Sequence, residues 1–176
     1  SDDNVTKIAE DFSGALWVGT INGLNRLDMY ASGFTIYRHL PASKKSLGHD
    51  FVLSMIEDQG GDLWFGTLGG GVSVLHNGGT FVHHRHEASN PNTPGSDNIR
   101  ALLQDRTGII WLGTGHGIDV YEPDMGKFIR IPQIDQGDSS GFWTHCLCEG
   151  RDGSIWAGAN GLVRIRRREG ASPDGP

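Results

Sequence analysis

The sequence predicts an all-β fold built from four copies of one structural unit. Three observations support this prediction: a high glycine content, a tryptophan motif that recurs at a regular spacing, and short apolar segments on both sides of every motif. Glycine accounts for 27 of the 176 residues, about twice its usual share of ~7%, which is typical of chains rich in tight turns. Five tryptophans and seven phenylalanines are enough to build a core, so a disordered chain is excluded.

The tryptophan motif defines the repeat. It reads GALWVGT in its first copy, and its tryptophans are 47, 47 and 45 residues apart. We interpret the motif as the second strand of each unit. The four copies lie at 14–20, 61–67, 108–114 and 153–159, around Trp17, Trp64, Trp111 and Trp156.

A first strand and a hairpin turn are expected before each motif. The apolar segments that predict these strands are 5–10, 52–57, 99–104 and 144–149. In three copies an aspartate follows the strand, three residues before the glycine of the motif; these are Asp11, Asp58 and Asp105. Aspartate accepts backbone N–H bonds and glycine permits positive φ, so this pair indicates a short turn. The fourth copy has Gly150 at this position and Asp152 directly before Gly153, so we expect a different turn there.

Two further strands are expected after each motif. A glycine turn leads into the third strands, at 24–27, 72–75, 118–121 and 162–165. Outer strands that open with phenylalanine follow in three copies, at 34–39, 81–86 and 128–131. The fourth copy lacks an outer strand before the C-terminal tail, 170–176.

The four units are expected to form part of a β-propeller. A four-stranded sheet with apolar residues on both faces cannot bury both faces alone, but radial stacking of such sheets buries them. The glycine two residues after each tryptophan lies on the tryptophan face, where we infer that it makes room for the neighbouring blade. We expect a partial propeller over 1–169, with blades at about 5–39, 52–86, 99–131 and 144–166.

The repeat resembles that of the two-component regulator propeller family. The pattern V-x-x-I-x-E-D-x-x-G-x-L-W-x-G-T-x-x-G-L-x-R is matched by 5–26, and F-x-x-Y-R-H by 34–39, followed by Ser46-Leu47. The resemblance covers about 5–165 and weakens in the fourth copy, at Gly150 and Ala159. Such repeats are characteristic of the extracytoplasmic sensor regions of bacterial hybrid histidine kinases and related receptors. The resemblance therefore implies a periplasmic or extracytoplasmic, non-catalytic module that senses ligands, often saccharides, for a membrane-anchored receptor with a separate kinase or cyclase output domain.

Propellers of this family usually close with more blades than the four found here. We therefore expect this chain to be part of a larger propeller. Its two open blade faces would be covered by remaining blades of the same receptor or by a homo-oligomer, for example a second copy that completes an eight-blade ring. No cofactor is expected.

Charge and composition exclude some other classes. The net charge of −6 and the pI of about 5.7 argue against a sequence-independent nucleic-acid binder. No apolar stretch approaches the ~20 residues of a membrane span, so no membrane contact by this segment is expected. We interpret the basic cluster, Arg164, Arg166, Arg167 and Arg168, as a solvated edge, and Cys146 and Cys148 as free, half-buried thiols.

A ligand is expected to bind at the end of the propeller that carries the blade-to-blade linkers. The linkers at 40–51, 87–98 and 132–143 are the longest and least repetitive segments. Trp143 stands outside the tryptophan repeat, and an aromatic side chain beside Asp, Asn and His suits a sugar ring. The candidate ligand-binding residues are Lys44, Lys45, His49, Asp50, Asn98, His116, Phe142 and Trp143.

Other chemistry is less well supported. The run 83–86 (HHRH) would suit a metal, but 37–39 (YRH) occupies the same repeat position, so we assign these histidines to the scaffold and expect no metal site. The carboxylate pairs recur in several blades and are interpreted as turn formers, and no catalytic residue is assigned. The alternatives are a protein-interaction scaffold and, with less support, a streptogramin-lyase-like enzyme, in which Gly66 would interrupt the W-F-T run common in that group.

Overall fold

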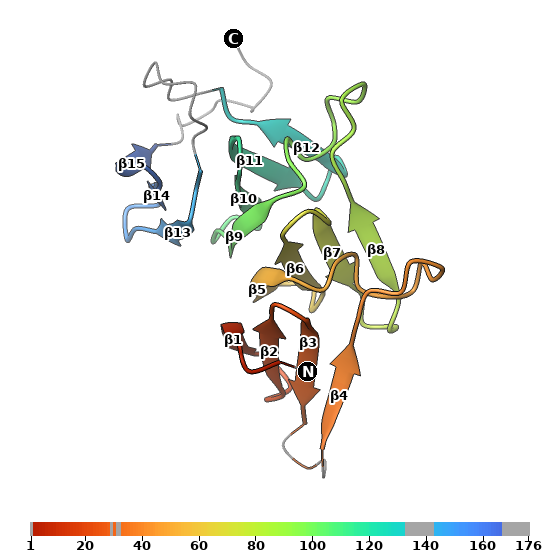
Figure 1. Cartoon of the computed structure of the whole chain (residues 1–176). Coiled ribbons are helices and arrows are strands. Elements are labelled where there is room, and N and C mark those ends of the chain that lie inside the picture. Colours follow the sequence, from red (N-terminus) through yellow and green to blue (C-terminus); the bar gives the residue numbers. More distant parts are fainter. Residues whose placement is uncertain (1, 29, 31–32, 133–142, 167–176) are drawn as a thin grey trace.

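The computed structural model describes residues 2–28, 30, 33–132 and 143–166. In this part of the chain all regular structure is β-strand, in four antiparallel sheets whose strands follow one another in sequence order (Figure 1). We call these sheets blades 1 to 4.

Blade 1 comprises β1 (Val5–Glu10), β2 (Leu16–Thr20), β3 (Gly23–Leu27) and β4 (Phe34–Tyr37). Blade 2 comprises β5 (Val52–Glu57), β6 (Leu63–Thr67), β7 (Val72–Leu75) and β8 (Phe81–His84). Blade 3 comprises β9 (Ile99–Gln104), β10 (Ile110–Thr114), β11 (Gly117–Glu122) and β12 (Lys127–Arg130). Blade 4 comprises β13 (Cys146–Glu149), β14 (Ile155–Gly158) and β15 (Leu162–Ile165).

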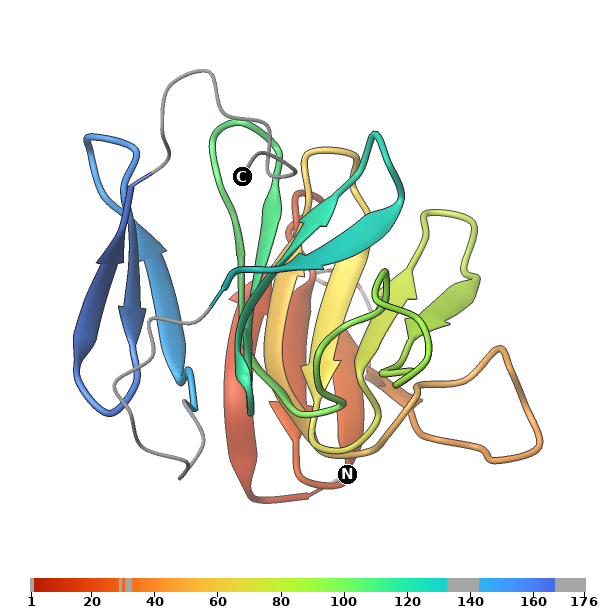
Figure 2. The same cartoon turned by 90° about the horizontal axis from the view of Figure 1, so that it is seen from above.

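The blades stand side by side in an open arc (Figure 1). The first strands, β1, β5, β9 and β13, lie on its inner side and contact one another in sequence, while β4, β8 and β12 lie outside. Figure 2 shows the same arrangement from above, with the strands upright. The all-β prediction of propeller blades is therefore confirmed.

The outer strands end earlier than expected. β4 ends at Tyr37 and β8 at His84, two residues before the expected limits. The backbone N–H of His39 donates to Asp50 Oδ1 at 2.6 Å, and that of His86 donates to Asp97 Oδ1 at 2.7 Å. A side chain of the following linker thus replaces the strand partner, and the chain leaves the sheet.

The first strand of blade 4 begins later than expected, at Cys146 instead of 144. Thr144 is buried, and its backbone N–H donates to the carbonyl of Thr114 in blade 3 at 3.1 Å. This residue therefore joins two blades instead of extending its own sheet.

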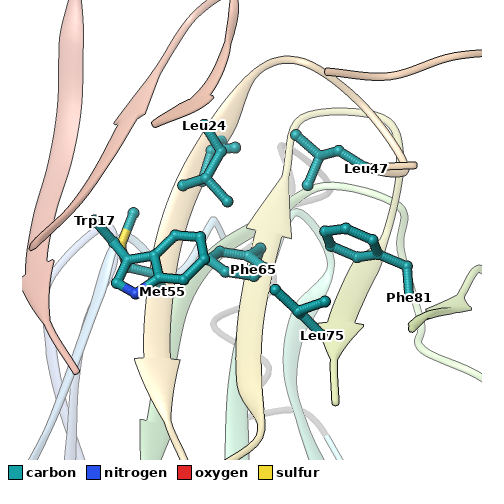
Figure 3. Close-up of a cluster of buried hydrophobic side chains, with 8 residues drawn as sticks. Trp17, Leu24, Leu47, Met55, Phe65, Leu75 and Phe81 are labelled. Carbon is teal, nitrogen blue, oxygen red and sulfur yellow. The ribbon is translucent and has the colours of Figure 1, made fainter. Parts of the chain in front are cut away.

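The core lies between the blades. Trp17 and Leu24 of blade 1 pack against Met55, Phe65 and Phe81 of blade 2, together with Leu47 from the linker (Figure 3). The centroid of the Trp17 ring lies 5.5 Å from that of Phe65. Equivalent clusters form around the next two repeat tryptophans. Each of these tryptophans therefore faces the following blade.

The three buried tryptophans are at most 4% exposed, whereas Trp156 in blade 4 is only half-buried. By strand alternation its indole lies on the face of blade 4 that points away from blade 3. Among the described residues no further blade covers that face. Trp156 is therefore less buried than the other three tryptophans, because a repeat tryptophan is buried by the next blade and not by its own sheet.

Each turn aspartate also anchors a tryptophan. The indole Nε1–H of Trp17, Trp64 and Trp111 donates to the Oδ2 atom of the aspartate six residues before it, at 2.8 Å in each blade. Oδ1 of Asp105 accepts the backbone N–H groups of Thr107 and Ile109, as expected of a turn former. Burial would raise the pKa of Asp105, but the hydrogen bonds from Thr107, Trp111 and Ile109 outweigh it and lower the pKa.

The turn of blade 4 is built differently, as expected. Asp152 accepts the backbone N–H and the hydroxyl of Ser154, and its carboxylate pairs with Arg164. The Arg164 guanidinium carbon lies 5.2 Å from the ring centroid of Trp156. Arg164 and Arg166 are exposed, as expected of a solvated edge, and Arg164 in addition binds Asp152; the other two arginines of that cluster lie outside the described residues.

The inference about the repeat glycines holds for three blades. A Cβ on Gly19 would lie 3.1 Å from Val52, one on Gly66 would lie 2.7 Å from the carbonyl oxygen of Ile99, and one on Gly113 would lie 2.7 Å from Thr144. All three contacts are with the next blade. Gly158 differs, because a Cβ there would meet only Sγ of Cys146 in its own sheet.

The two cysteines are exposed, so the expectation of half-buried thiols is wrong. Cys146 and Cys148 alternate along β13 with Leu147, which packs toward blade 3. Their side chains therefore lie on the open face of blade 4, the face of Trp156. Burial again depends on a neighbouring blade.

The histidines of blade 2 contact the scaffold. His83 Nδ1 lies 3.1 Å from the Ser73 hydroxyl, and His86 Nδ1 lies 2.9 Å from the carbonyl of Pro94. The His84 ring lies 5.1 Å from the ring of Phe128 and 6.1 Å from that of Trp64. These contacts support their assignment to the scaffold.

We predict that the chain loses stability as the pH falls below 6.5. Burial lowers the pKa of both His83 and His84 from the ordinary value of 6.5. Below pH 6.5 the unfolded chain therefore binds protons that the folded chain does not bind. The contribution of these two histidines to the free energy of unfolding is thus complete above pH 6.5 and is lost as the pH falls. Urea unfolding at pH 7.5 and 5.5 should show this loss.

His84→Phe keeps an aromatic ring between Trp64 and Phe128 and removes the titrating group. We expect a smaller loss of unfolding free energy between the two pH values than in the unmodified chain. His84→Gln should also reduce the pH dependence but with lower stability at pH 7.5, which separates titration from packing. An equal pH dependence in all three chains would contradict the prediction.

Candidate functional site

The two ends of the blades carry different segments. The linkers and the turns between second and third strands lie at one end, which we call the linker end; the aspartate turns lie at the other. All candidate ligand residues belong to segments of the linker end. The structure nevertheless divides them into separate groups.

Lys44 and Lys45 lie away from the inner side of the arc. Their loop projects outward beside blade 2 (Figures 1 and 2), and the backbone of Lys44 hydrogen-bonds to His83 on β8. Both lysines are exposed. They are therefore not brought together with the candidate residues near the first strands.

Asp50 closes the base of its linker. Besides accepting the N–H of His39, it accepts the backbone N–H of Gly23 at its own carbonyl, at 2.8 Å. Asp97 makes the equivalent contacts with His86 and with Gly69 and Gly71. We call each aspartate–histidine pair a linker clasp. The sequence contained a signal for it, because each aspartate follows its histidine by eleven residues.

His49 and His116 make local turn contacts. His49 is half-buried, and its Nδ1 accepts the backbone N–H of Phe51 at 3.1 Å. His116 is exposed, and its backbone N–H donates to the Thr114 hydroxyl at 3.0 Å. Only the second imidazole is fully available at the surface.

Asn98 and Trp143 do come together, across the boundary between blades 3 and 4. A Cβ built on the buried Gly115 would lie 3.6 Å from both side chains. His116 follows in the same turn. We call Asn98, Arg100, His116 and Trp143 the rim cluster. Phe142, the neighbour of Trp143, lies outside the described residues.

Arg100 is the member of the rim cluster that the sequence analysis missed. Its guanidinium carbon lies 4.5 Å from the ring centroid of Trp143, within the range of a cation–π contact. Its Nε is buried and has no hydrogen-bond partner in the structure. The charge and the aromatic ring therefore form one surface feature.

A β-bulge places Arg100. The pairing of β9 with β10 skips this residue, since Ile99 pairs with Thr114 and Ala101 with Gly113. Blades 1 and 2 have the same irregularity at Thr6 and Leu53. A bulge redirects the side chain of the extra residue, so the repeat provides this position and blade 3 alone fills it with a cation.

The rim cluster combines an aromatic ring, a guanidinium, an amide and an imidazole. Trp143 supplies an aromatic surface, partly covered by Arg100, and Asn98 and His116 supply donors and acceptors. The carboxylates of Asp50 and Asp97 bind backbone N–H groups in the linker clasps. Within the described ranges no three His, Cys, Asp or Glu side chains gather as a metal site would require.

A surface groove of about 590 Å³ lies at the opposite end, between the aspartate turns of blades 2 and 3. Its lining comes from turn residues within 58–60, 104–109 and 122–125. None of the candidate ligand residues lines it. The sequence prediction and this groove therefore indicate different ends of the blades. Trp143 and Arg100 lie at the linker end, whereas no aromatic side chain is among the described residues that line the groove.

Comparison with protein families identifies the repeat. The family model described as "Two component regulator propeller" matches residues 46–69 and 93–116. These two segments match two-component regulator propeller repeats. Both matched segments begin in a linker, include the aspartate of a linker clasp, and continue through an aspartate turn and a second strand, whereas the clasp histidines His39 and His86 lie before them. A search of curated proteins gives no match.

Solved structures show the same fold at low identity. One similar structure is the extracellular domain assigned to a hybrid two component system of B. thetaiotaomicron, with a TM-score of 0.78, 19% identity, and coverage of 94% of this chain and 25% of that chain. A second domain of this kind from the same organism has a TM-score of 0.71 and 22% identity, with coverage of 93% of this chain and 21% of that chain. Virginiamycin B lyase from Staphylococcus aureus, solved with quinupristin, has a TM-score of 0.66 and 18% identity, with coverage of 92% of this chain and 52% of that chain. This chain of propeller repeats thus spans about a quarter of the first structures it matches. None of its described segments forms a helix long and apolar enough to cross a membrane.

Proposed function

We propose that the chain is part of the extracytoplasmic sensor propeller of a hybrid two-component receptor, and that it binds a saccharide at the rim cluster without catalysing a reaction. The repeats and the likeness to extracellular domains of hybrid two component systems support the receptor assignment. The observation that carries the ligand proposal is the pairing of Trp143 with Arg100 beside Asn98 and His116.

The chemistry of the rim cluster fits a sugar. The C–H face of a pyranose packs on an aromatic ring, and its hydroxyls need several donors and acceptors around that ring. Arg100 covers part of the Trp143 ring and holds it in one orientation, so the remaining surface of the indole is preorganised. The guanidinium, the Asn98 amide and the His116 imidazole can then hydrogen-bond hydroxyl groups.

A lyase activity is less well supported. The likeness to virginiamycin B lyase is at 18% identity and concerns the fold. Gly66, which interrupts the W-F-T run, packs against blade 3, which is a scaffold role. The carboxylate of the buried Asp119 accepts the N–H of Gly95 at 2.7 Å and lies 3.4 Å from Arg130, so it serves the interface between blades 2 and 3.

Replacing Trp143 should abolish saccharide binding without unfolding the chain. A glycan array identifies the oligosaccharide, and calorimetry then measures its affinity for Trp143→Ala. We expect at least about a tenfold loss, which corresponds to ~1.4 kcal/mol, with little change in Tm because this side chain is only half-buried. Trp143→Phe should retain part of the affinity.

Trp156→Ala is the matched control, because it removes a half-buried tryptophan on a different surface. It should leave saccharide affinity unchanged. Equal losses in the two alanine variants, an unfolded Trp143→Ala chain, or an array with no bound glycan would contradict the proposal.

A further inference from the structure

Three arginines among the described residues lie over tryptophan rings, and two of them also pair with a carboxylate. The guanidinium carbon of Arg26 lies 5.5 Å from the ring centroid of Trp17, and its Nη2 lies 2.6 Å from Oδ1 of Asp28. The contact of this kind in blade 4 likewise includes a carboxylate, that of Asp152. In both places the chain itself supplies the charge that balances the arginine.

Arg100 is the third of these arginines, and it lacks a carboxylate partner. Its distance from the Trp143 ring, 4.5 Å, is the shortest of the three. No carboxylate of the described residues forms an ion pair with it, and its buried Nε has no hydrogen-bond partner. The carboxylate nearest in sequence, Asp97, accepts the backbone N–H of His86. A half-buried charge without a counter-ion is unfavourable, so this place lacks an anionic group.

The scaffold does not need an arginine at this position. Thr6 and Leu53 stand at the same bulge in blades 1 and 2. The Thr6 hydroxyl donates to the carbonyl of Val52 at 2.5 Å, and leucine has no polar group in its side chain. Both blades therefore form without a charge there. The cation of blade 3 is an addition to the repeat, and it lies against the one tryptophan that stands outside the repeat.

We propose that the ligand of the rim cluster is an acidic saccharide, whose carboxylate or sulfate group pairs with the Arg100 guanidinium while a sugar ring packs on Trp143. This inference rests on the saccharide site proposed above and adds the chemical class of its ligand. Because Nε is buried, the ligand meets the two Nη groups, whose N–H donors can bind two oxygens of one anionic group. The anion then supplies the counter-ion that the described residues lack.

The unmodified chain tests the need for a negative charge. A glycan array that holds neutral, uronate-bearing and sulfated oligosaccharides should show binding to acidic glycans. Calorimetry then compares the bound glycan with its neutral form, the methyl ester of a uronate or the desulfated form of a sulfated sugar. Both neutral forms keep the sugar rings. We expect them to bind at least about tenfold more weakly, as loss of a hydrogen bond between charged groups predicts.

Variants test whether Arg100 is the group that reads the charge. Arg100→Gln should lower the affinity for the acidic glycan at least about tenfold and leave that for the neutral form unchanged. Arg100→Lys keeps the charge and should retain part of the preference. Arg26→Gln is the matched control, because it removes an arginine that lies over a tryptophan on another surface. It should leave both affinities unchanged, and thermal unfolding shows whether each variant is folded.

The outcomes separate this inference from the function on which it rests. Acidic and neutral forms that bind equally tightly, with binding lost in Trp143→Ala, would overturn the acidic ligand and leave the saccharide site in place. An array without any bound glycan would overturn both proposals. A preference for the acidic form that persists in a folded Arg100→Gln chain would assign the anionic group to another residue, and it would also overturn this inference.

Discussion

Trp111→Ala is expected to lower the free energy of unfolding by roughly 3–5 kcal/mol, the usual cost of truncating a buried tryptophan. The side chain is 2% exposed and packs against Ile155 and Ala157 of blade 4. Its removal also leaves Oδ2 of the buried Asp105 without its indole donor. The contact between blades 3 and 4 should therefore weaken along with the turn.

Trp156→Ala is the matched variant within the same repeat. Its ring is half-buried, and Asp152 does not hold its indole as the turn aspartates of the other blades hold theirs. We expect a loss of about 1 kcal/mol, measured by urea unfolding at a concentration where the chain is monomeric. Similar losses for the two variants would show that stability does not come from packing between blades.

Gly66→Ala should cost about 1–3 kcal/mol, as overpacking in a core does. A methyl group there would meet the hydroxyl of Ser54 in its own blade, which can rotate, and would lie 2.7 Å from the carbonyl oxygen and 2.8 Å from Cγ2 of Ile99 in blade 3. The carbonyl belongs to backbone and cannot rotate away, so blades 2 and 3 would have to move apart.

Gly158→Ala is the matched control for this effect. The new methyl group would meet only Sγ of Cys146, at 2.5 Å, and this thiol can change rotamer on an open face. We expect a change within about 0.5 kcal/mol, as for most surface substitutions. Urea unfolding measures both variants, and a Gly66→Ala chain as stable as Gly158→Ala would contradict the role assigned to the repeat glycine.

The fold was predictable because the same sequence signals recur in each blade. The tryptophan spacing, the turn aspartates and the alternation of the strands all point to four-stranded sheets that must stack. Strand ends at Tyr37 and Cys146 were not predictable, because contacts with a linker and with a neighbouring blade decide them. The indole–carboxylate bond was missed because it joins residues six positions apart across a hairpin.

The candidate site was predictable only in part. Trp143 stood out because it breaks the repeat, and Asn98 is near it in the structure, beside Gly115 in the turn that also carries His116. Arg100 was missed because a bulge, invisible in the hydrophobic pattern, turns its side chain toward Trp143. Lys44 was included because linker membership does not reveal whether a residue lies at the inner or the outer side of the arc.

The linker clasps have a consequence for how such proteins diversify. His39 and Asp50 fasten the two ends of one loop, and His86 and Asp97 fasten the next, while within the first loop only Leu47 and its neighbours pack on the core. Residues can be added to or removed from the enclosed segments at small entropic cost, since closure entropy grows slowly with length. Natural variation can thus change the exposed part of these loops while the architecture stays unchanged.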